Sequence, residues 1–459
     1  MSDNFPNMNY LNLCYNSTIQ EIKSKYSRWW VGSLIEIGPF IKLQRTKQEM
    51  TQGDLAEGIV SLSYLSKIEN KKTEASPEII QLLCNRLGIE LSDGVDSNLE
   101  EKCKQWYEML YDVYDKTKII ATYKELQGMM DKSLNDSLLM FEIHKIRYYL
   151  VLRQIDKALS KINELNEMAS SFNITQHYYW CKFKGNYYSH TGEFNQAMHL
   201  YKIAEDKINQ IDIDETEIAD LHYTISVTNS KLRNTLEVID YANKAMDIFQ
   251  KNYNFIRCAQ CHILLGISYH RIKMYDKAIK NYNLAKHLGE LEKNNQVIQL
   301  TNHNLGYLYS TVGNAKEAIK YYLFVVEDEE ESININGRLT AITSLIQEYY
   351  NLKNYERASE MAEKAKIILN KAYDKDNHYY QLYSYLIQTY TYALNNEEEK
   401  FKSFVTDEFI PYLKHHEDYG NLVLYAKMLG NYFEENGKYK ESVKYYKLAN
   451  STYNELINL

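Results

Sequence analysis

Small, aliphatic and aromatic residues recur along most of the chain with a period of about 40 residues, from Met140 to Leu459. The pattern shared by eight copies is a small or aliphatic residue, an aromatic residue three places later and a small residue nine places after that, with departures in two copies. The clearest copy contains Gly266, Tyr269 and Ala278. Residues three apart lie on one face of an α-helix, and turn signals separate the second position from the third. The pattern therefore predicts repeated pairs of antiparallel helices.

Two copies depart from the pattern, and one further copy is degenerate. Asn229 replaces the aromatic residue, and Glu399 stands where a small residue is expected. A buried Asn229 is either a cost in the core or a polar group with a partner. The degenerate copy runs from Trp106 to Met130. Because one pair cannot bury its apolar face alone, about nine pairs should stack into a right-handed superhelical solenoid with a concave wall.

A different pattern fills residues 33–90. Gly38 and Pro39 favour the start of a helix, and the next segments read as short helices separated by glycine turns. A short helix, a glycine turn and a second short polar helix are typical of a helix-turn-helix. The second helix, from Ser61 to Asn70, is small enough to enter the major groove of DNA. The predicted fold class is thus all-α.

The remaining segments set the domain boundaries. Residues 1–32 show little pattern, and we interpret them as a poorly ordered arm; the alternative is a basic arm touching DNA or a helix exchanged in a dimer. Residues 91–100 are polar and predict a linker. The repeat domain is expected to span residues 101–459.

Composition and charge indicate what class of protein this is and which partners it can bind. The chain has 459 residues, 4 prolines and 17 glycines, which suits a helical soluble protein, and no apolar run is long enough for a membrane span. We therefore expect a cytoplasmic protein with no membrane partner. The net charge is −8, but residues 1–92 hold 10 Lys/Arg and 10 Asp/Glu. This neutral front segment permits binding to nucleic acid.

No motif for catalysis or metal binding is present. The sequence lacks a glycine-rich phosphate loop, an HExxH motif and a GxSxG motif. Cys258 and Cys261 have metal-like spacing but no second pair, so we interpret them as helix residues. His415 and His416 are read as part of a solvated turn. The sequence predicts no enzyme and no cofactor.

The segment from Met50 to Asn70 resembles the DNA-binding domain shared with phage lambda repressor and Cro. The resemblance implies that Gln52 contacts phosphate and that Ala56 packs on Leu65. It places the base-reading positions at Ser61, Ser63, Tyr64, Lys67 and Asn70, with Lys71 and Lys72 on phosphates. The alternatives are a simple helix-start role for Gln52 and a packing role for Tyr64. We interpret Glu69 as a structural residue that pairs locally, because a carboxylate facing phosphates is costly.

The repeat columns resemble those of a tetratricopeptide array, although the spacing exceeds the usual period of about 34 residues. A lambda-repressor-type domain followed by such an array resembles the peptide-sensing quorum-sensing regulators of Gram-positive bacteria, the RRNPP family, and within it the NprR type. The resemblance implies a transcription regulator that dimerises through the solenoid and binds a short signalling peptide on its concave face. It also implies a second activity, the sequestration of a response regulator.

The repeat geometry independently suggests which side chains face the concave wall. Amide side chains there suit an extended peptide, because each can donate to and accept from its main chain. Lys231 and Arg271 could hold a C-terminal carboxylate or an acidic side chain. The alternative is that these positions are polar only because they are solvated. The candidate peptide-binding residues are Asn186, His190, Asn229, Lys231, Arg271, Asn304, Tyr307, Gln347 and Asn351.

The sequence thus predicts a peptide-gated regulator that binds double-stranded DNA as a homodimer or higher homo-oligomer. One alternative is an interaction scaffold or inhibitor that sequesters a response regulator and uses the helix-turn-helix only for protein contacts. Another is a phage lysis–lysogeny peptide receptor with the same layout.

Overall fold

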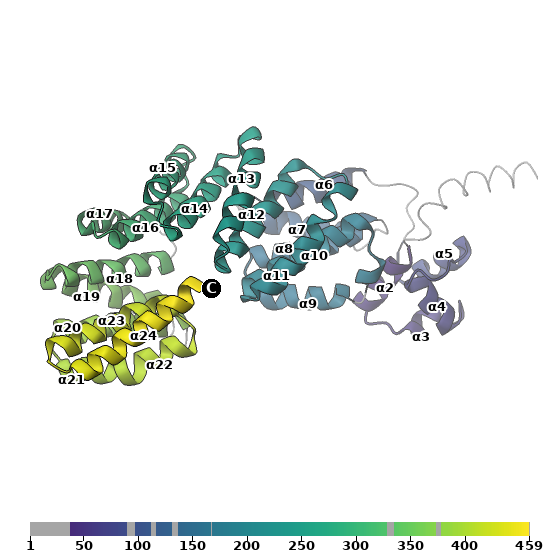
Figure 1. The fold of residues 1–459 in the computed structure, drawn as a ribbon. Helices are drawn as coiled ribbons and strands as arrows, with labels where there is room; N and C mark the ends of the chain where they lie inside the picture. The colour runs from purple at the N-terminus through teal and green to yellow at the C-terminus, as the bar shows by residue number, and fades with distance from the viewer. Residues whose placement is uncertain are drawn as a thin grey trace, which may run out of the picture. The chain divides into compact units, whose positions relative to one another are not determined.

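The computed structural model describes residues 37–89, 97–111, 116–130, 136–166, 168–327, 335–372 and 378–458. Throughout these ranges the regular secondary structure is helical, and they contain no strand (Figure 1). The chain divides into two compact units, Met1–Ile213 and Asp214–Leu459. The predicted arm at 1–32 and most of the predicted linker lie outside the described residues.

The first unit opens with four short helices: α2 (Ile37–Lys47), α3 (Gln52–Ala56), α4 (Leu62–Glu69) and α5 (Pro77–Arg86). Three of them begin at hydroxyl caps. Thr51 and Asp54 form a reciprocal capping box at α3, and the Ser61 and Ser76 hydroxyls accept from backbone amides of α4 and α5. Gly38 allows α2 to approach α4, because a Cβ atom there would collide with the carbonyl oxygen of Ile68.

These four helices share one small apolar core. Ala56 and Leu65, the pair expected to join α3 to α4, are both buried in it together with Ile41, Ile80 and Leu83. The core therefore fixes the angle between α3 and α4, as a helix-turn-helix requires.

The first unit continues with three helix pairs. They are formed by α6 (Ser97–Met109), α7 (Lys116–Met130), α8 (Asp136–Val151), α9 (Ile155–Asn166), α10 (Ile174–Thr191) and α11 (Phe194–Glu205). The degenerate copy predicted from Trp106 is the pair α6 and α7, and the Trp106 side chain is fully buried there.

The second unit holds the other pairs, stacked one after another (Figure 1). Its helices are α12 (Glu215–Lys231), α13 (Thr235–Lys251), α14 (Phe255–Arg271), α15 (Tyr275–Leu291), α16 (Asn295–Thr311), α17 (Ala315–Glu327), α18 (Ile335–Asn351), α19 (Tyr355–Ala372), α20 (His378–Leu394), α21 (Glu398–Ser403), α22 (Ile410–His415), α23 (Tyr419–Glu435) and α24 (Tyr439–Asn458). Together with the first unit, the described helices form nine pairs, which confirms the predicted fold class.

The weak copy containing Glu399 has an irregular second helix. It is split into α21, a π-helical segment at Phe404–Phe409, and α22. Glu399 is exposed, pairs with Lys402 and is not packed between the helices. In the regular copies the equivalent alanine is fully buried, as at Ala278 and Ala318. Loss of the small residue therefore coincides with loss of the regular close pair.

Two further searches of the described residues bear on function. None of their helices combines the length and the apolarity needed to cross a membrane. They hold no group of three or more His, Cys, Asp or Glu side chains placed to bind a metal ion. Cys258 and Cys261 lie buried in α14, where burial raises the pKa of both thiols.

Candidate DNA-binding and peptide-binding sites

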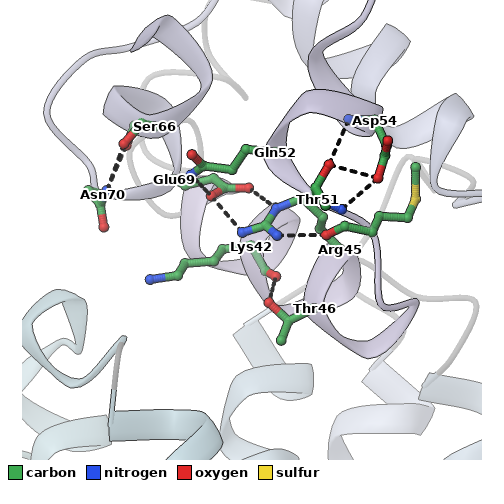
Figure 2. A network of polar contacts seen from close by, with 10 residues as sticks. Lys42, Arg45, Thr46, Thr51, Gln52, Asp54, Ser66, Glu69 and Asn70 are labelled. Carbon is green, nitrogen blue, oxygen red and sulfur yellow. Dashed lines mark hydrogen bonds and ion pairs between the residues drawn. The ribbon is translucent and has the colours of Figure 1, made fainter. Parts of the chain in front are cut away.

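A buried ion pair anchors α4, the predicted DNA-reading helix, to α2 (Figure 2). The Arg45 guanidinium donates from Nε to Oε1 of Glu69 over 2.7 Å and from Nη2 to Oε2 over 3.1 Å. The third guanidinium nitrogen donates to the carbonyl of Met50. Glu69 is buried, and this bidentate pairing confirms its interpretation as a structural residue.

Gln52 joins the same network from the first residue of α3. Its amide nitrogen donates to Oε2 of Glu69 over 2.7 Å, and the side chain is half-buried (Figure 2). The structure therefore gives Gln52 a role in linking α3 to α4. A contact between Gln52 and phosphate stays a proposal.

The opposite face of α4 points to solvent. Ser63 and Lys67 are exposed there, and neither side chain has a hydrogen-bond partner within the described residues. Because the Ser63 hydroxyl and the Lys67 ammonium group have no partner among the described residues, these two side chains are the best placed of the candidates to bind an external ligand. Lys67 lies in the last turn of α4.

Three other candidates on α4 also serve the helix itself. Ser61 is the N-cap, and Asn70 is the C-cap, with its side-chain nitrogen donating to the carbonyl of Ser66 over 2.8 Å. Tyr64 is half-buried against the helix-turn-helix core, and its hydroxyl donates to the carbonyl of Glu74. Ser61 and Asn70 remain exposed, so capping and DNA contact are compatible for them.

Lys71 follows α4 directly and occupies the left-handed region, with φ of 55°. Its amide donates to the carbonyl of Ile68, which closes the end of the helix. The side chain is half-buried.

The two peptide-binding candidates of the first unit both lie on α10 but differ in exposure. Asn186 is buried, and its side-chain oxygen accepts from the hydroxyl of Tyr201 over 2.9 Å. His190 is exposed at the end of the helix. Desolvation, followed by the charges of Arg147 and Arg153, lowers the pKa of His190.

Asn229, in the second unit, is buried and has partners on both sides of its amide. The nitrogen donates to the carbonyl of Ile225 over 3.1 Å, and the oxygen accepts from Asn234 over 3.0 Å. Of the two readings left open by the sequence, the structure supports a buried polar group with a partner. The pair with Asn234 ties α12 to the turn before α13.

Arg271 and Lys231 lie at the ends of neighbouring first helices. The Arg271 guanidinium donates to the carbonyl of Ser230 over 2.8 Å, which joins the end of α14 to the end of α12. No carboxylate among the described residues pairs with either cation. Desolvation, and to a smaller extent the neighbouring charge of Arg233, lower the pKa of Arg271.

The remaining candidates follow on α16 and α18. Tyr307 is 57% exposed, and its ring lies 5.2 Å from the ring of His270. Asn304 is half-buried and donates to the carbonyl of Leu300 in its own helix. Gln347 is half-buried and Asn351 is exposed. Tyr307, Asn351, Lys231 and Arg271 are therefore accessible, whereas Asn186 and Asn229 serve the packing.

One polar residue of this region was missed from the sequence. Glu348 on α18 is only 6% exposed, and the hydroxyl of Ser310 on α16 donates to its carboxylate. No lysine or arginine of the described residues pairs with it. The available signal was a glutamate two places after Ile346, because most other copies have a buried residue at this position, as at Ser268 and Leu308.

Fold and site together define a class of protein: a helix-turn-helix protein that carries a tetratricopeptide-type repeat array. Two family models agree with this. The helix-turn-helix model matches residues 41–93, and the tetratricopeptide repeat model matches residues 301–327.

Comparison with known proteins identifies the family. The chain is 33% identical to the transcriptional activator NprA of Geobacillus stearothermophilus over 409 residues, which cover 88% of this chain and 100% of NprA. It is 21% identical to the response regulator aspartate phosphatase I of Bacillus subtilis over 359 residues, 76% of this chain and 89% of that protein. The chain belongs to the RRNPP family of peptide-sensing regulators and is of the NprR type.

Solved structures share the fold. The apo form of the quorum sensor NprR from B. thuringiensis superimposes with a TM-score of 0.65 at 20% identity, over 78% of this chain and 99% of that chain. The apo form of RapI gives 0.62 at 19% identity, over 78% and 98%. Membership of the family confirms the expectation of a transcription regulator rather than an enzyme.

Proposed function

We propose that this transcription regulator binds double-stranded DNA through α4 and that a short peptide, held by the first helices of its repeats, controls this binding. The observation that carries the proposal is the asymmetry of α4. Its buried side is fixed by Glu69 and Arg45, while Ser63 and Lys67 stand exposed and unpartnered on the other side. A helix held rigidly by its back and polar on its front suits insertion into the major groove.

The exposed candidates divide by the chemistry that they offer. Lys67 supplies a positive charge for a phosphate or for a guanine edge, and Ser63 supplies a hydroxyl for a base or a phosphate. Ser61, Asn70, Lys71 and Gln52 are proposed to position the helix on the backbone of the DNA. In a homodimer the two copies of α4 would read half-sites about 34–36 Å apart, or multiples of that spacing.

The peptide site is proposed along α12, α14, α16 and α18 of the second unit. Arg271 and Lys231 have no carboxylate partner within the described residues, so they would accept a carboxylate of the peptide. Tyr307, Gln347 and Asn351 would contact its main chain or apolar side chains. A solved structure with the same fold, NprR in complex with its cognate peptide NprX, has a TM-score of 0.57, so a protein with this fold binds a peptide.

The proposal is tested by the variant Lys67→Ala combined with Asn70→Ala. We expect binding to duplex DNA to weaken strongly and the salt dependence of the remaining binding to become shallower by about one phosphate contact, because one cation is lost. Fluorescence anisotropy with a labelled mixed-sequence duplex over a range of salt concentrations measures both. Lys102→Ala is the matched control, because Lys102 lies in an exposed ion pair with Glu125 on the helices α6 and α7. Duplex binding by the double variant equal to that of the wild-type protein would overturn the assignment of α4.

A second candidate function is the sequestration of a response regulator by the repeat array. It is favoured by relatives that are named response regulator aspartate phosphatases and align with about three quarters of this chain. The salt titration separates the two candidates. A DNA reader shows a steep negative slope of affinity with salt, whereas a protein that uses its helix-turn-helix only for protein contacts shows no appreciable duplex binding.

A further inference from the structure

Glu142 on α8 lies at the centre of a buried cluster of charges. Its side chain has no exposed surface, and three ammonium groups donate to it. Lys145 of the same helix and Lys161 of α9 are each 2.8 Å away, and Lys47 at the end of α2 is 2.6 Å away. The first two belong to the repeat array, whereas Lys47 belongs to the helix-turn-helix. The Glu142 carboxylate thus joins the repeat array to Lys47, which lies 95 positions earlier in the chain.

The cluster is balanced without Lys47. Lys161 also donates to Glu164, so Lys145 and Lys161 face two carboxylates within the array itself. Both oxygens of Glu142 keep a partner when Lys47 leaves, because Oε1 accepts from Lys145 and Oε2 accepts from Lys161. Lys47 is also the most exposed of the three lysine side chains, at 21%, so water can solvate its ammonium group on release. The contact can therefore open without leaving a buried charge unpaired.

The same helix that carries Lys47 also holds the DNA-reading helix. Arg45, two residues earlier on α2, makes the bidentate pair with Glu69 of α4. Two separate ion pairs therefore connect α2 to its neighbours: Lys47 pairs with Glu142 of α8, and Arg45 pairs with Glu69 of α4, so the backbone of α2 links the two contacts. The two carboxylates differ in how many cationic partners they have. Arg45 is the main charged partner of Glu69, whereas Lys47 is one of three partners of Glu142.

We propose that the Lys47–Glu142 contact is a reversible latch between the helix-turn-helix and the repeat array, which positions α4 and transmits changes in the array to it. Lys47 is thus a positioning residue for DNA binding. The role of Lys47 in DNA binding rests on the proposed function. The opening and closing of the Lys47–Glu142 contact does not depend on that function. Its opening detaches α2 from α8 while the Arg45–Glu69 pair keeps the helix-turn-helix intact.

Hydrogen exchange of the full chain, followed by mass spectrometry, tests the latch. In Lys47→Gln we expect the amides of residues 44–50 to exchange roughly threefold to fivefold faster, as suits the loss of one partly exposed ion pair. In Glu142→Gln the same amides should also exchange faster, although the substitution lies on another helix. Lys47→Arg should restore wild-type exchange because it retains the charge. Lys102→Gln, which removes an exposed lysine from the ion pair with Glu125, should leave residues 44–50 unchanged.

The outcomes separate the latch from the proposed function. Faster exchange in both Lys47→Gln and Glu142→Gln, with rescue by Lys47→Arg, supports the latch. Wild-type exchange at residues 44–50 in Lys47→Gln overturns it, and so does faster exchange in Lys47→Gln without any effect of Glu142→Gln, since the cause would then be local to α2. Duplex binding by the wild-type protein is measured in parallel, and its absence overturns the proposed function without touching the exchange result.

Discussion

The backbone of Gly266 lies directly against the ring of Tyr282, so that a Cβ atom at Gly266 would come within 2.4 Å of Cε1. The same approach recurs, always sixteen residues apart, at Gly185 with Tyr201, Gly306 with Tyr322 and Gly430 with Tyr446. Where the first residue is larger, the residue sixteen places later is usually small, as at Ser226 with Ala242, Ile346 with Ala362 and Ile387 with Ser403. In the four glycine copies, the missing side chain on the first helix thus leaves room for the tyrosine ring of the second helix, which keeps the space between the two helices filled.

This contact predicts that Gly266→Ala destabilises the second unit. The new methyl group must displace a buried tyrosine ring, and overpacking of this kind costs about 1–3 kcal/mol. Chemical denaturation followed by circular dichroism measures the loss. Gly128→Ala on α7 is the matched control, because nothing lies within 4 Å of a Cβ atom at that position and alanine favours a helix. Equal stability of Gly266→Ala and the wild-type protein would show that the ring moves aside freely.

The repeat pairs could be predicted from the sequence because their contacts are local in the chain and repeated. Gly266, Tyr282 and Ala278 lie within one copy, so alignment of the copies reveals their relation. The helix-turn-helix was predictable for a similar reason, because its caps at Thr51, Ser61 and Ser76 are short-range signals.

The exposure of the site residues was harder to predict. Asn186 and Tyr307 occupy the same position of their repeats, one place after the glycine, yet Asn186 is buried and Tyr307 is exposed. The difference comes from partners, because the hydroxyl of Tyr201 donates to Asn186. A helical period gives the face of a helix but not what the next helix places against it. The contact of Lys47 with Glu142 joins two different domains, and no periodicity indicates it.

Removal of the positive partner of Glu69 should unfold the helix-turn-helix more readily. Among the described residues, the buried carboxylate of Glu69 keeps only its hydrogen bond from Gln52 in Arg45→Met, and such a loss costs about 3–5 kcal/mol. Hydrogen exchange of α4 and thermal unfolding of the full chain should both report the change. The double variant Arg45→Met with Glu69→Leu should recover much of the stability, because no unpaired charge is left. Lys67→Met, at an exposed site on the same helix, is expected to change stability by less than about 0.5 kcal/mol.

His144 should make the first unit sensitive to mild acid. The imidazole is buried against the ring of Tyr107 at a centroid distance of 4.0 Å, and neither ring nitrogen has a hydrogen-bond partner in the part of the chain that the structure describes. Burial, with the charge of Lys182 as a smaller cause, lowers the pKa of His144 to about 3. The unfolded chain, with a histidine pKa of about 6.5, therefore takes up the proton first, and stability falls as the pH drops from about 6.5 toward 3.

Between pH 7 and pH 5 this histidine should cost the wild-type protein on the order of 2 kcal/mol. His144→Phe retains the stacking on Tyr107 and should remove that part of the pH dependence. The measurement is the difference in denaturation midpoint between the two proteins at each pH. The two proteins must be compared with each other, because burial also lowers the pKa of His303 in the second unit, to about 4. His303 contributes the same pH dependence to both proteins, so its contribution cancels in the difference. Parallel curves for the two proteins would show that the pKa of His144 is the same in the folded and the unfolded chain.

Removal of the charge of Glu348 should stabilise the second unit. Its buried carboxylate accepts a hydrogen bond from the hydroxyl of Ser310 and pairs with no cation within the described residues. Burial of a charge without an opposite charge is unfavourable. Glu348→Gln removes the charge and can still accept the hydrogen bond from Ser310, so we expect the second unit to gain about 1 kcal/mol in denaturation experiments.

Glu348→Ala should instead lose stability, because it also removes the hydrogen bond and leaves a void. A loss in Glu348→Gln comparable to that in Glu348→Ala would mean that the charge itself stabilises the fold. If Glu348→Gln is the more stable protein, folding does not explain a glutamate at this position. The carboxylate would then be a candidate to bind a cationic group of the peptide, opposite in charge to the site at Arg271.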